Sequence, residues 1–460
     1  MLGLADHLRA PWLGRLLLTI TDRLRGFGAL ELLAEIEGAP FVPPERVREM
    51  QFHRLSALLN HAELRVPYYR EMFRRLGIRS QEIRSLHDFA QLPVLTKDII
   101  RERERDLVRD DVPFESLSPH FSGGSTGVPL KFYRSRDYMA ASEAATYRNL
   151  QQCGWQPGDM VAFFWGGNDR LYAMSRWEFE LRQLVRRMYQ FDPFHSGIEE
   201  MARWARRFRT LRPRVVLGYA STVARFAVWV ERSGDSVPPV LGVFTTAEKL
   251  YAAQREVIER VFGCHVFDCY GSSEVQNIAT ECPRGSMHIN ADFVVVEEDR
   301  VDRPATARPL LVTSLWNWSM PFIRYRNEDC GSLVNEACGC ANHFPLMRLD
   351  IARISDNFLL PDGRVVHGEF FTHLMYGSEG IANFQFHQSA PGEITLWIVP
   401  GTGDPEAREQ KIRDAIRQIQ ALTLGHEIRI DVRHTDAIPL SREGKHRFTR
   451  SAVMEDSHVA

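Results

Sequence analysis

Four short apolar runs, separated by helical segments, restrict the fold of this chain more than any other feature of its sequence. The runs are predicted to be buried strands: Val161–Trp165, Val215–Leu217, Val240–Thr245 and His265–Phe267. Helices are predicted between them, for example at Gly197–Leu211 and Tyr251–Phe262. Strands that alternate with helices predict an α/β fold for this part of the chain.

The chain has 460 residues, too many for one hydrophobic core, because domains contain roughly 100–200 residues. Residues 1–110 are predicted to be mainly helical, and later strands are expected at Asp292–Glu297 and Pro309–Ser314. We therefore expect a large N-terminal domain over residues 1–350 and a small C-terminal α+β domain over residues 351–460.

The small domain contains three predicted strands and one predicted helix. The strands are Phe384–His387, Ile394–Ile398 and Glu427–Val432, and the helix is Pro405–Leu422. The last stretch, Ile438–Arg450, is polar and is predicted to be a loop that can swing over a neighbouring surface.

The charge balance argues against two classes of partner. The formal net charge is −2, whereas binding to nucleic acids or to anionic membranes needs a basic surface. The N-terminal apolar run Leu16–Thr21 lies between Arg15 and Asp22 and is too short for a transmembrane segment. We expect an amphipathic helix packed on the body of the protein, with peripheral membrane contact as the alternative.

Two further features favour a reduced, cytoplasmic protein. The first residues lack the small-residue cleavage pattern of a secretory signal, and seven cysteines, an odd number, do not suggest a disulfide framework. Arginine supplies most of the positive charge. The five lysines are Lys97, Lys131, Lys249, Lys411 and Lys445.

Residues 121–130, Phe-Ser-Gly-Gly-Ser-Thr-Gly-Val-Pro-Leu, are rich in glycine and hydroxyl groups. Glycine lets backbone N–H groups approach a polyphosphate closely, and hydroxyl groups can donate to phosphate oxygens. The candidate phosphate contacts are Ser122, Gly123, Gly124, Ser125, Thr126 and Gly127. No Lys-Ser/Thr pair follows the last glycine, which argues against an ordinary P-loop hydrolase. An ordinary polar turn is the alternative.

Three later segments carry side chains suited to a nucleotide. Tyr270-Gly-Ser-Ser-Glu274 follows a predicted strand, and ligands of α/β proteins bind at such strand ends. Asp329, in Arg324-Tyr-Arg-Asn-Glu-Asp329, can accept hydrogen bonds from both hydroxyl groups of a ribose. Lys445 lies in the polar segment Ser441–Arg447.

These four segments, in this order, resemble the adenylate-forming superfamily of acyl-CoA synthetases, luciferases and peptide-synthetase adenylation domains. Length and detail are most similar to its phenylacetate–CoA ligase-like branch, from about residue 50 to the end. The resemblance implies a large α/β domain of the adenylate-forming type and a small mobile α+β domain. It also implies a reaction of a carboxylic acid with ATP that gives acyl-AMP and pyrophosphate.

The resemblance implies a role for each segment. Residues 122–127 would bind the β- and γ-phosphates, and Glu274 would hold Mg²⁺. The other nucleotide contacts would be Thr246, Ala247, Glu248, Tyr270, Gly271, Ser272, Ser273, Asp329 and Arg353. The catalytic residues would be Lys445, Glu274 and Thr126, with the Lys445 ammonium at the α-phosphate and the substrate carboxylate.

A second half-reaction is also implied, in which coenzyme A, a carrier-protein thiol or an amine takes the acyl group. Residues 352–356 resemble the inter-domain hinge of the family. Phenylacetate ligases have a Val-Asn-Val-Phe-Pro stretch after this hinge, whereas this chain has Val365–His373. Within this segment His367 and Glu369 could form local hydrogen bonds or act on the acceptor. The departure leaves the acceptor open and does not affect adenylation.

Three thiols and one imidazole could form a tetrahedral zinc site: Cys282, His288, Cys338 and Cys340. Because four protein ligands leave no open position, the metal would be a structural brace. Cys330 and His343 are competitors for a ligand position, and four reduced side chains without metal are the alternative. The remaining thiols are predicted to lie in the core or to line a pocket: Cys153, Cys264 and Cys269.

In related enzymes the acyl pocket lies between the third-strand region and the tyrosine turn. The corresponding candidates are Phe164, Trp165, Tyr219, Ala220, Phe244 and Cys269. An aromatic wall suits a planar aryl acid or a medium apolar chain, and ordinary core packing is the alternative. No residue identifies the acid.

Two functions are compatible with these patterns. The first is an AMP-forming ligase that uses ATP and Mg²⁺ to activate an aryl or medium acyl acid and passes the acyl group to an acceptor. The second is an inactive, zinc-braced nucleotide-binding scaffold that acts through protein partners. The oligomeric state is open.

Overall fold

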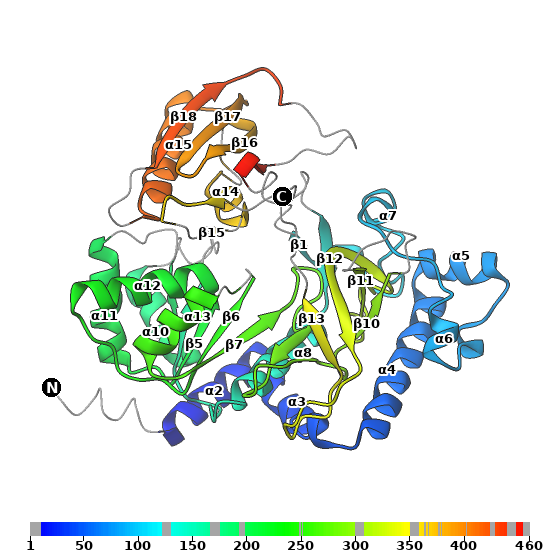
Figure 1. Ribbon diagram of the computed structural model, residues 1–460. Coiled ribbons are helices and arrows are strands. Elements are labelled where there is room, and N and C mark those ends of the chain that lie inside the picture. The colour runs from blue at the N-terminus through cyan, green and yellow to red at the C-terminus, as the bar shows by residue number, and fades with distance from the viewer. Residues whose placement is uncertain are drawn as a thin grey trace.

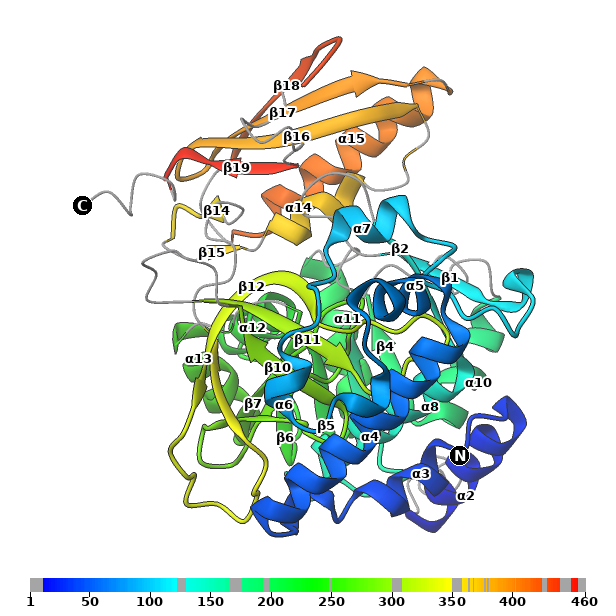
Figure 2. The ribbon, with the colours of Figure 1, turned by 90° about the vertical axis from the view of Figure 1, so that its right-hand side faces the viewer.

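A computed structural model gives the fold of the chain (Figures 1 and 2). It describes residues 11–121, 130–165, 175–192, 198–247, 250, 252–299, 308–349, 358–362, 365–366, 368–375, 378, 380–401, 403–423, 428–438 and 448–453. Within these ranges, no helix is both long enough and apolar enough to cross a lipid bilayer.

An eleven-stranded sheet forms the centre of the large domain, in the order β10-β11-β12-β13-β9-β8-β7-β6-β5-β3-β4. The parallel strands are β3 (Val161–Phe164), β4 (Met188–Phe191), β5 (Val215–Tyr219), β6 (Gly242–Thr246) and β7 (His265–Tyr270). The antiparallel strands are β8 (Ala279–Glu281), β9 (Met287–Ile289), β10 (Val294–Glu298), β11 (Arg308–Ser314), β12 (Tyr325–Val334) and β13 (Leu346–Leu349). The β7–β8 pair joins the two halves.

Both faces of the parallel half are buried, because successive side chains of each strand point to opposite sides. In β5, Val215 and Leu217 belong to the core that contains the N-terminal helices, whereas Val216 belongs to a second core. The helices around this sheet are α8 (Arg136–Gln151), α10 (Arg176–Arg186), α11 (Ile198–Leu211), α12 (Ala220–Ser233) and α13 (Ala252–Phe262).

Helices form most of the first 110 residues, as the sequence predicts. They are α2 (Pro11–Arg25), α3 (Ala29–Ile36), α4 (Pro44–Arg65), α5 (Pro67–Leu76), α6 (Leu86–Phe89) and α7 (Lys97–Glu102), with 3₁₀ turns at Ala39–Phe41, Ser80–Glu82 and Phe114–Ser116. Local signals fix the ends: Pro67 begins α5 and Gly77, with φ 69°, ends it. The hydroxyl groups of Ser85 and Thr96 cap α6 and α7.

A hairpin of β1 (Ser118–Phe121) and β2 (Lys131–Arg134) flanks the glycine-rich segment. Since the two strands pair directly, both ends of that segment are held together. The buried amide of Asn317 fixes β2 by donating to the carbonyl of Tyr133 (Nδ2···O 3.0 Å).

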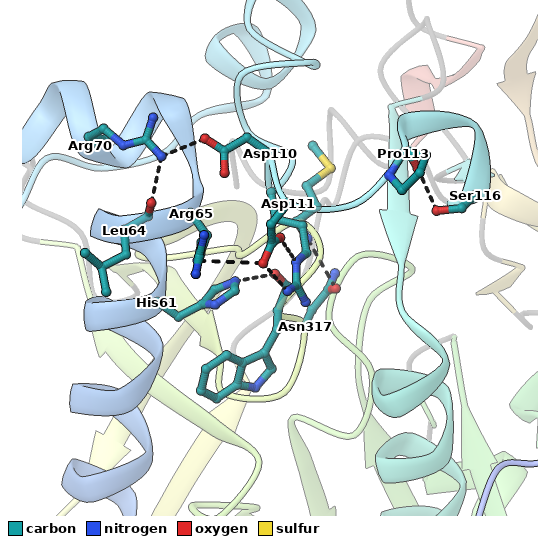
Figure 3. A network of polar contacts seen from close by, with 12 residues as sticks. His61, Leu64, Arg65, Arg70, Asp110, Asp111, Pro113, Ser116 and Asn317 are labelled. Atoms are coloured by element: carbon teal, nitrogen blue, oxygen red, sulfur yellow. Dashed lines mark hydrogen bonds and ion pairs between the residues drawn. The ribbon is translucent and has the colours of Figure 1, made fainter.

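A polar network ties the loop before this hairpin to α4 and α5 (Figure 3). Arg70 of α5 donates to Asp110 (2.7 Å), and Arg109 donates to Asp111 (Nη2···Oδ2 2.6 Å). The hydrogen bonds from Arg109 lower the pKa of Asp111 to about 2, so this carboxylate stays ionised at neutral pH. The network therefore positions the base of the hairpin.

The described residues from 358 onwards form a C-terminal unit with its own hydrophobic core, shown at the top of Figure 1. Its main sheet has the order β18-β17-β16-β19. The elements are β14 (Phe358–Leu359), β15 (Val365–Val366), α14 (Gly368–Met375), β16 (Ile381–Ala390), β17 (Glu393–Pro400), α15 (Pro405–Gln420), β18 (Arg429–His434) and β19 (Thr449–Ser451). The domain boundary expected at residues 350 and 351 lies at the edge of an undescribed range and stays a prediction.

The sequence predicts the α/β core and, in the C-terminal unit, β16, β17, α15 and β18. It misses α14 and the strands β1, β2, β4, β8, β9, β12, β13, β14, β15 and β19. One prediction is wrong at its C-terminal end. We expected a polar loop over Ile438–Arg450, whereas Thr449 and Arg450 lie in β19, which pairs in parallel with β16. Residues 439–447 of that stretch lie outside the described residues. β19 is stabilised by backbone hydrogen bonds to a strand distant in sequence, which local polarity does not reveal.

The close approach of β5 to β3 yields a stability prediction. A Cβ atom on Gly218 would lie 2.5 Å from the Cβ atom of Phe164. We expect Gly218→Ala to lower the free energy of unfolding by about 1–3 kcal/mol, measured by urea denaturation. Gly38→Ala is the matched control, because its Cβ would meet no atom within 4 Å. Equal effects of the two changes would contradict the packing.

Candidate active site

Side chains from four parallel strands meet at one edge of the sheet, because the carboxyl ends of parallel strands lie together. Trp165 follows β3, Tyr219 ends β5, Thr246 ends β6 and Tyr270 ends β7. Ligands of α/β proteins bind at this edge. The fold thus brings together four residues that the sequence predicts for the site.

The Tyr270 hydroxyl connects this edge to β12 in the antiparallel half. It donates to the carboxylate of Asp329 (Oη···Oδ2 2.8 Å) and accepts a hydrogen bond from the amide of Asn327 (Nδ2···Oη 2.7 Å). Asn327 also donates to Asp329 (3.2 Å). The predicted adenine contact and the predicted ribose contact are therefore parts of one hydrogen-bonded cluster.

A bulge in β12 lies at this cluster. Pro309 pairs with Cys330 and Leu311 pairs with Arg326, so that Leu310 alone faces residues 327–329. A bulge redirects side chains locally and is common beside active sites. Here the irregular stretch contains both residues that hydrogen-bond to the tyrosine.

Glu274 is a buried carboxylate in the turn after β7, with 5% of its surface exposed. The hydroxyl group of Tyr325 donates to it (Oη···Oε1 3.0 Å). Carboxylate oxygen is the donor type that Mg²⁺ prefers, and phosphate oxygens can complete such a shell. Glu274 therefore fits the predicted magnesium ligand.

Arg134, at the end of β2, adds a cation beside this carboxylate. Its guanidinium donates to the carbonyl of Ser273. Burial lowers its pKa, while the nearby Tyr138 and Glu274 act in the opposite direction. Among the described residues, its buried Nε has no hydrogen-bond partner. Because β2 continues from the glycine-rich segment, this guanidinium is placed to bind an anion near it.

The turn between Tyr270 and Glu274 is fixed from both sides. Ser272 accepts a hydrogen bond from the N–H of Val275 (Oγ···N 3.1 Å), and the hydroxyl group of Tyr138 accepts one from the N–H of Gln276 (2.9 Å). A Cβ atom on Gly271 would lie 3.1 Å from the backbone N of Asn277. The tyrosine and the carboxylate are thus held in one rigid turn.

Aromatic rings line the acyl side of the edge. The rings of Trp165 and Tyr219 lie 4.4 Å apart, and Trp165 stacks on Phe163 at 5.3 Å. Ala220 is buried at the start of α12, and Cys269 is partly exposed in β7. Two candidates are core residues instead: Phe164 and Phe244 are fully buried. Their side chains pack against other rings of the core.

Several predicted site residues lie outside the described residues: Ser122, Gly123, Gly124, Ser125, Thr126, Gly127, Glu248, Arg353, His367 and Lys445. The Glu369 side chain also belongs to this group. Ala247, in the segment 246–248 expected beside adenine, is described. Its φ of +66° is uncommon for alanine. Such backbone conformations concentrate at functional sites.

The four predicted zinc ligands converge: one ligand atom from each of Cys282, His288, Cys338 and Cys340 lies within 4.8 Å of the others. The Sγ atoms of Cys282 and Cys338 are 3.7 Å apart, close to the ~3.8 Å edge of a zinc–thiolate tetrahedron. His288 directs Nδ1 at the carbonyl of Phe344 (2.9 Å) and Nε2 at Cys340 (3.3 Å). This is the orientation of a metal-binding histidine.

The two competitors do not join this cluster. His343 instead directs its Nδ1 atom at the carbonyl of Val42 (2.9 Å), and Cys330 lies in β12 outside the cluster. Burial opposes ionisation of Cys338, but hydrogen bonds with Ser286, His288 and Cys340 outweigh it and lower its pKa to about 6, whereas burial raises the pKa of Cys340 to about 11. A thiolate at neutral pH suits a cation site.

Sequence reasoning misses three residues of the site: Arg134, Tyr325 and Asn327. Tyr325 and Asn327 belong to the segment quoted for Asp329. Tyr325, Asn327 and Asp329 follow one another at intervals of two residues, which is the repeat of one strand face. Recognition of that strand could have identified them. Arg134 has no comparable signal, since its contact with Ser273 joins segments 139 residues apart.

A partly buried carboxyl group lies beside the aromatic edge. Asp268 of β7 accepts a hydrogen bond from Thr245 (Oγ1···Oδ1 2.9 Å), and its backbone N–H donates to Glu281 (2.9 Å). Arg255 pairs with Glu281 (2.7 Å). Burial, and then the negative charge of Glu281, raise the pKa of Asp268 to about 7.

The chain is similar to known proteins along most of its length. Residues 358–452 match the CapK C-terminal domain family. Protein CapK of Staphylococcus aureus is 24% identical over 413 residues, which cover 87% of this chain and 88% of that protein. Phenylacetate-coenzyme A ligase of Escherichia coli (strain K12) is 28% identical over 322 residues, which cover 63% of this chain and 68% of that enzyme.

The fold is also shared with solved structures. A 2-hydroxyisobutyryl-CoA ligase, in complex with 2-HIB-AMP and CoA in the thioesterification state, superposes with a TM-score of 0.61 at 22% identity. The match covers 92% of this chain and 93% of that one. The large α/β domain and the C-terminal unit thus follow the architecture of adenylate-forming CoA ligases.

Asp268 yields a prediction about pH. The folded-state pKa of about 7 lies above the unfolded value of 3.8, so Asp268 contributes a penalty that is absent below the unfolded pKa, grows as the pH rises between the two values, and is complete above the folded-state pKa. In Asp268→Asn we expect a smaller loss of stability between pH 5 and pH 8, by on the order of 1–3 kcal/mol. Urea midpoints at the two pH values measure it. An unchanged pH dependence would contradict the raised pKa.

Proposed function

We propose that this chain, which is similar to phenylacetate-coenzyme A ligases and shares the fold of a CoA ligase, is an adenylate-forming enzyme of their type: it activates a carboxylic acid with ATP and transfers the acyl group to coenzyme A. The observation that carries this proposal is the cluster at the carboxyl edge of β7. There a tyrosine ring, a carboxylate on β12 and a buried carboxylate in the following turn are held by direct hydrogen bonds. These groups match the needs of a nucleotide with its metal ion.

In the first half-reaction a carboxylate oxygen of the acid attacks the α-phosphorus of ATP, and pyrophosphate leaves. Both reactants are anionic, so the protein must neutralise charge and align them. We assign adenine to the ring of Tyr270 and the ribose hydroxyl groups to Asp329. Glu274 would hold Mg²⁺, which neutralises phosphate charge when bound. Arg134 would neutralise the phosphates from the side of the hairpin.

Two parts of this assignment rest on the resemblance. Residues 122–127 would bind the β- and γ-phosphates, with Thr126 as a hydroxyl donor, and Lys445 would reach the α-phosphate from the C-terminal unit. A compact ammonium on a flexible side chain suits a position where negative charge accumulates. Arg353 and Glu248 would complete the nucleotide contacts.

In the second half-reaction the thiol sulfur of coenzyme A attacks the acyl carbon, AMP leaves and the thiol proton is released. The phenylacetate-coenzyme A ligases among the relatives and the CoA-bound structure support this acceptor. Residues 358–452 match the CapK C-terminal domain family, and this range includes Val365–His373, where the sequence departs from the phenylacetate ligase pattern. The substrate side would be the aromatic edge at Trp165 and Tyr219, which suits an aryl or medium acyl acid.

We also propose a structural zinc ion at Cys282, His288, Cys338 and Cys340. The convergence of the four ligand atoms and the orientation of His288 support it. Cys282 follows β8, His288 lies in β9, and the other two thiols lie between β12 and β13. Since β9 pairs with β13, a metal here would join two hairpins of the antiparallel half.

The main test is the product spectrum with ATP, coenzyme A and a panel of aryl and aliphatic acids, measured by mass spectrometry. We expect AMP, pyrophosphate and one acyl-CoA.

Loss of charge stabilisation should make Lys445→Ala about 100- to 1000-fold slower in adenylation. Glu274→Gln, which keeps the acceptor for Tyr325, should be about 10- to 100-fold slower.

Lys411→Ala, on α15, is the matched lysine control and should stay within about twofold of the unmodified enzyme. Formation of ADP and phosphate, or full activity of Lys445→Ala, would contradict the mechanism. Absence of turnover with every acid, together with retained ATP binding, would favour the scaffold function instead.

The zinc site is tested by elemental analysis of protein purified without chelators. We expect about one zinc per chain. Cys282→Ser and Cys340→Ser should lose the metal and lower the unfolding temperature by several degrees, because binding free energy contributes to folding. Cys330→Ser is the control and should keep the zinc. A zinc content near zero in the unmodified protein would refute the site.

A further inference from the structure

Large apolar side chains form an exposed stripe along α2, the first helix described. Trp12, Leu16, Ile20 and Leu24 are 67%, 47%, 44% and 84% exposed. Each is four positions after the last, so they lie on adjoining parts of the helix surface. Soluble proteins rarely expose contiguous apolar surface of this kind unless it binds something.

The helix cannot rotate to bury this stripe, because its opposite side is fixed to the protein. Gly14 lies so close to Gly158 that a Cβ atom would be 2.3 Å from the Gly158 carbonyl oxygen. Leu18 is buried, and the carboxylate of Asp22 accepts hydrogen bonds from the N–H groups that begin α3 (3.1 Å each). The stripe therefore faces outward.

Helix α10 extends the apolar surface. Figures 1 and 2 both show α2 and α10 side by side, and the hydroxyl group of Thr21 contacts the carbonyl of Val185 (3.5 Å). On α10, Trp177 and Leu181 are 67% and 54% exposed. We call these six side chains the N-terminal apolar face: Trp12, Leu16, Ile20, Leu24, Trp177 and Leu181.

The charge along α2 is one-sided. Its exposed charged residues are Arg15 and Arg23, whereas its acidic residue, Asp22, is buried as the cap of α3. The α2 part of the face is thus flanked by basic groups although the whole chain has a net charge of −2, while on α10 the exposed Glu178 lies next to Trp177. In the sequence before the described residues, Leu4 and Leu8 have the same four-residue spacing, with Asp6 and Arg9 near them.

We propose that the N-terminal apolar face binds the surface of an anionic membrane. Interfacial helices combine Trp and Leu on one face with Arg at its border, and anionic headgroups attract such basic residues. A four-residue repeat turns by about 40° per step, so the stripe spreads over a broad sector of the helix. A broad sector suits a fluid apolar layer, whereas pairing with a helix of a second copy needs a narrow seam. This inference is independent of the proposed enzyme activity.

The test is flotation of the full-length protein with vesicles of phosphatidylcholine and phosphatidylglycerol (1:1) against pure phosphatidylcholine. We expect binding to the anionic vesicles that weakens with salt. Arg15→Gln and Arg23→Gln should each lower the partition coefficient about fivefold. The triple variant Trp12→Ser, Leu16→Ser, Ile20→Ser should lower it at least tenfold.

A matched control carries three serine substitutions at exposed leucines elsewhere, Leu64, Leu76 and Leu86, and should bind as the unmodified protein does. Circular dichroism and sedimentation velocity on all variants check the fold and the oligomeric state. Three outcomes overturn the proposal: absence of flotation, equal flotation of the triple variant and its control, or a dimer that the triple variant converts to a monomer. The last outcome would make the face an interface between two copies.

Discussion

The hydrogen bond between the hydroxyl group of Tyr270 and the carboxylate of Asp329 connects the two halves of the central sheet at the site. Tyr270 ends the last parallel strand, and Asp329 lies in an antiparallel strand four positions away in the sheet order. The groups that would bind adenine and ribose thus keep a fixed separation before any ligand arrives. Such preorganisation is the main way in which a protein stabilises a charged transition state.

The surrounding contacts keep this pair in place. Tyr325 holds the carboxylate of Glu274, Tyr138 holds the turn, and Asn317 holds the hairpin that leads to the glycine-rich segment. Each contact joins segments that are more than fifty residues apart in the sequence. The arrangement depends on the whole large domain, so substitutions distant from the site can affect it.

The sequence predicts the parallel half of the sheet except β4, and most of the residues at its edge, because apolar runs and glycine turns are local signals. It does not predict β19 or the strands that contain Tyr325 and His288, since short or polar strands depend on distant pairing partners. It finds Asp329 by resemblance but misses Asn327 and Arg134, whose roles arise only from tertiary contacts. It leaves open whether Phe164 and Phe244 line the pocket or belong to the core, because an aromatic residue beside a strand end has the same local pattern in both.

The bulge in β12 interrupts the regular pairing of β12 with β11 at the polar cluster proposed to recognise the ligand. Leu310 faces three residues where an ordinary ladder would pair it with one. A deletion of two residues there would restore an even ladder with β11 and remove part of the polar cluster at Tyr270. Selection for stability alone would favour the shorter strand, and we infer that ligand recognition offsets the cost of the extra length. Natural variation in this strand should accordingly occur by substitution, with its length unchanged.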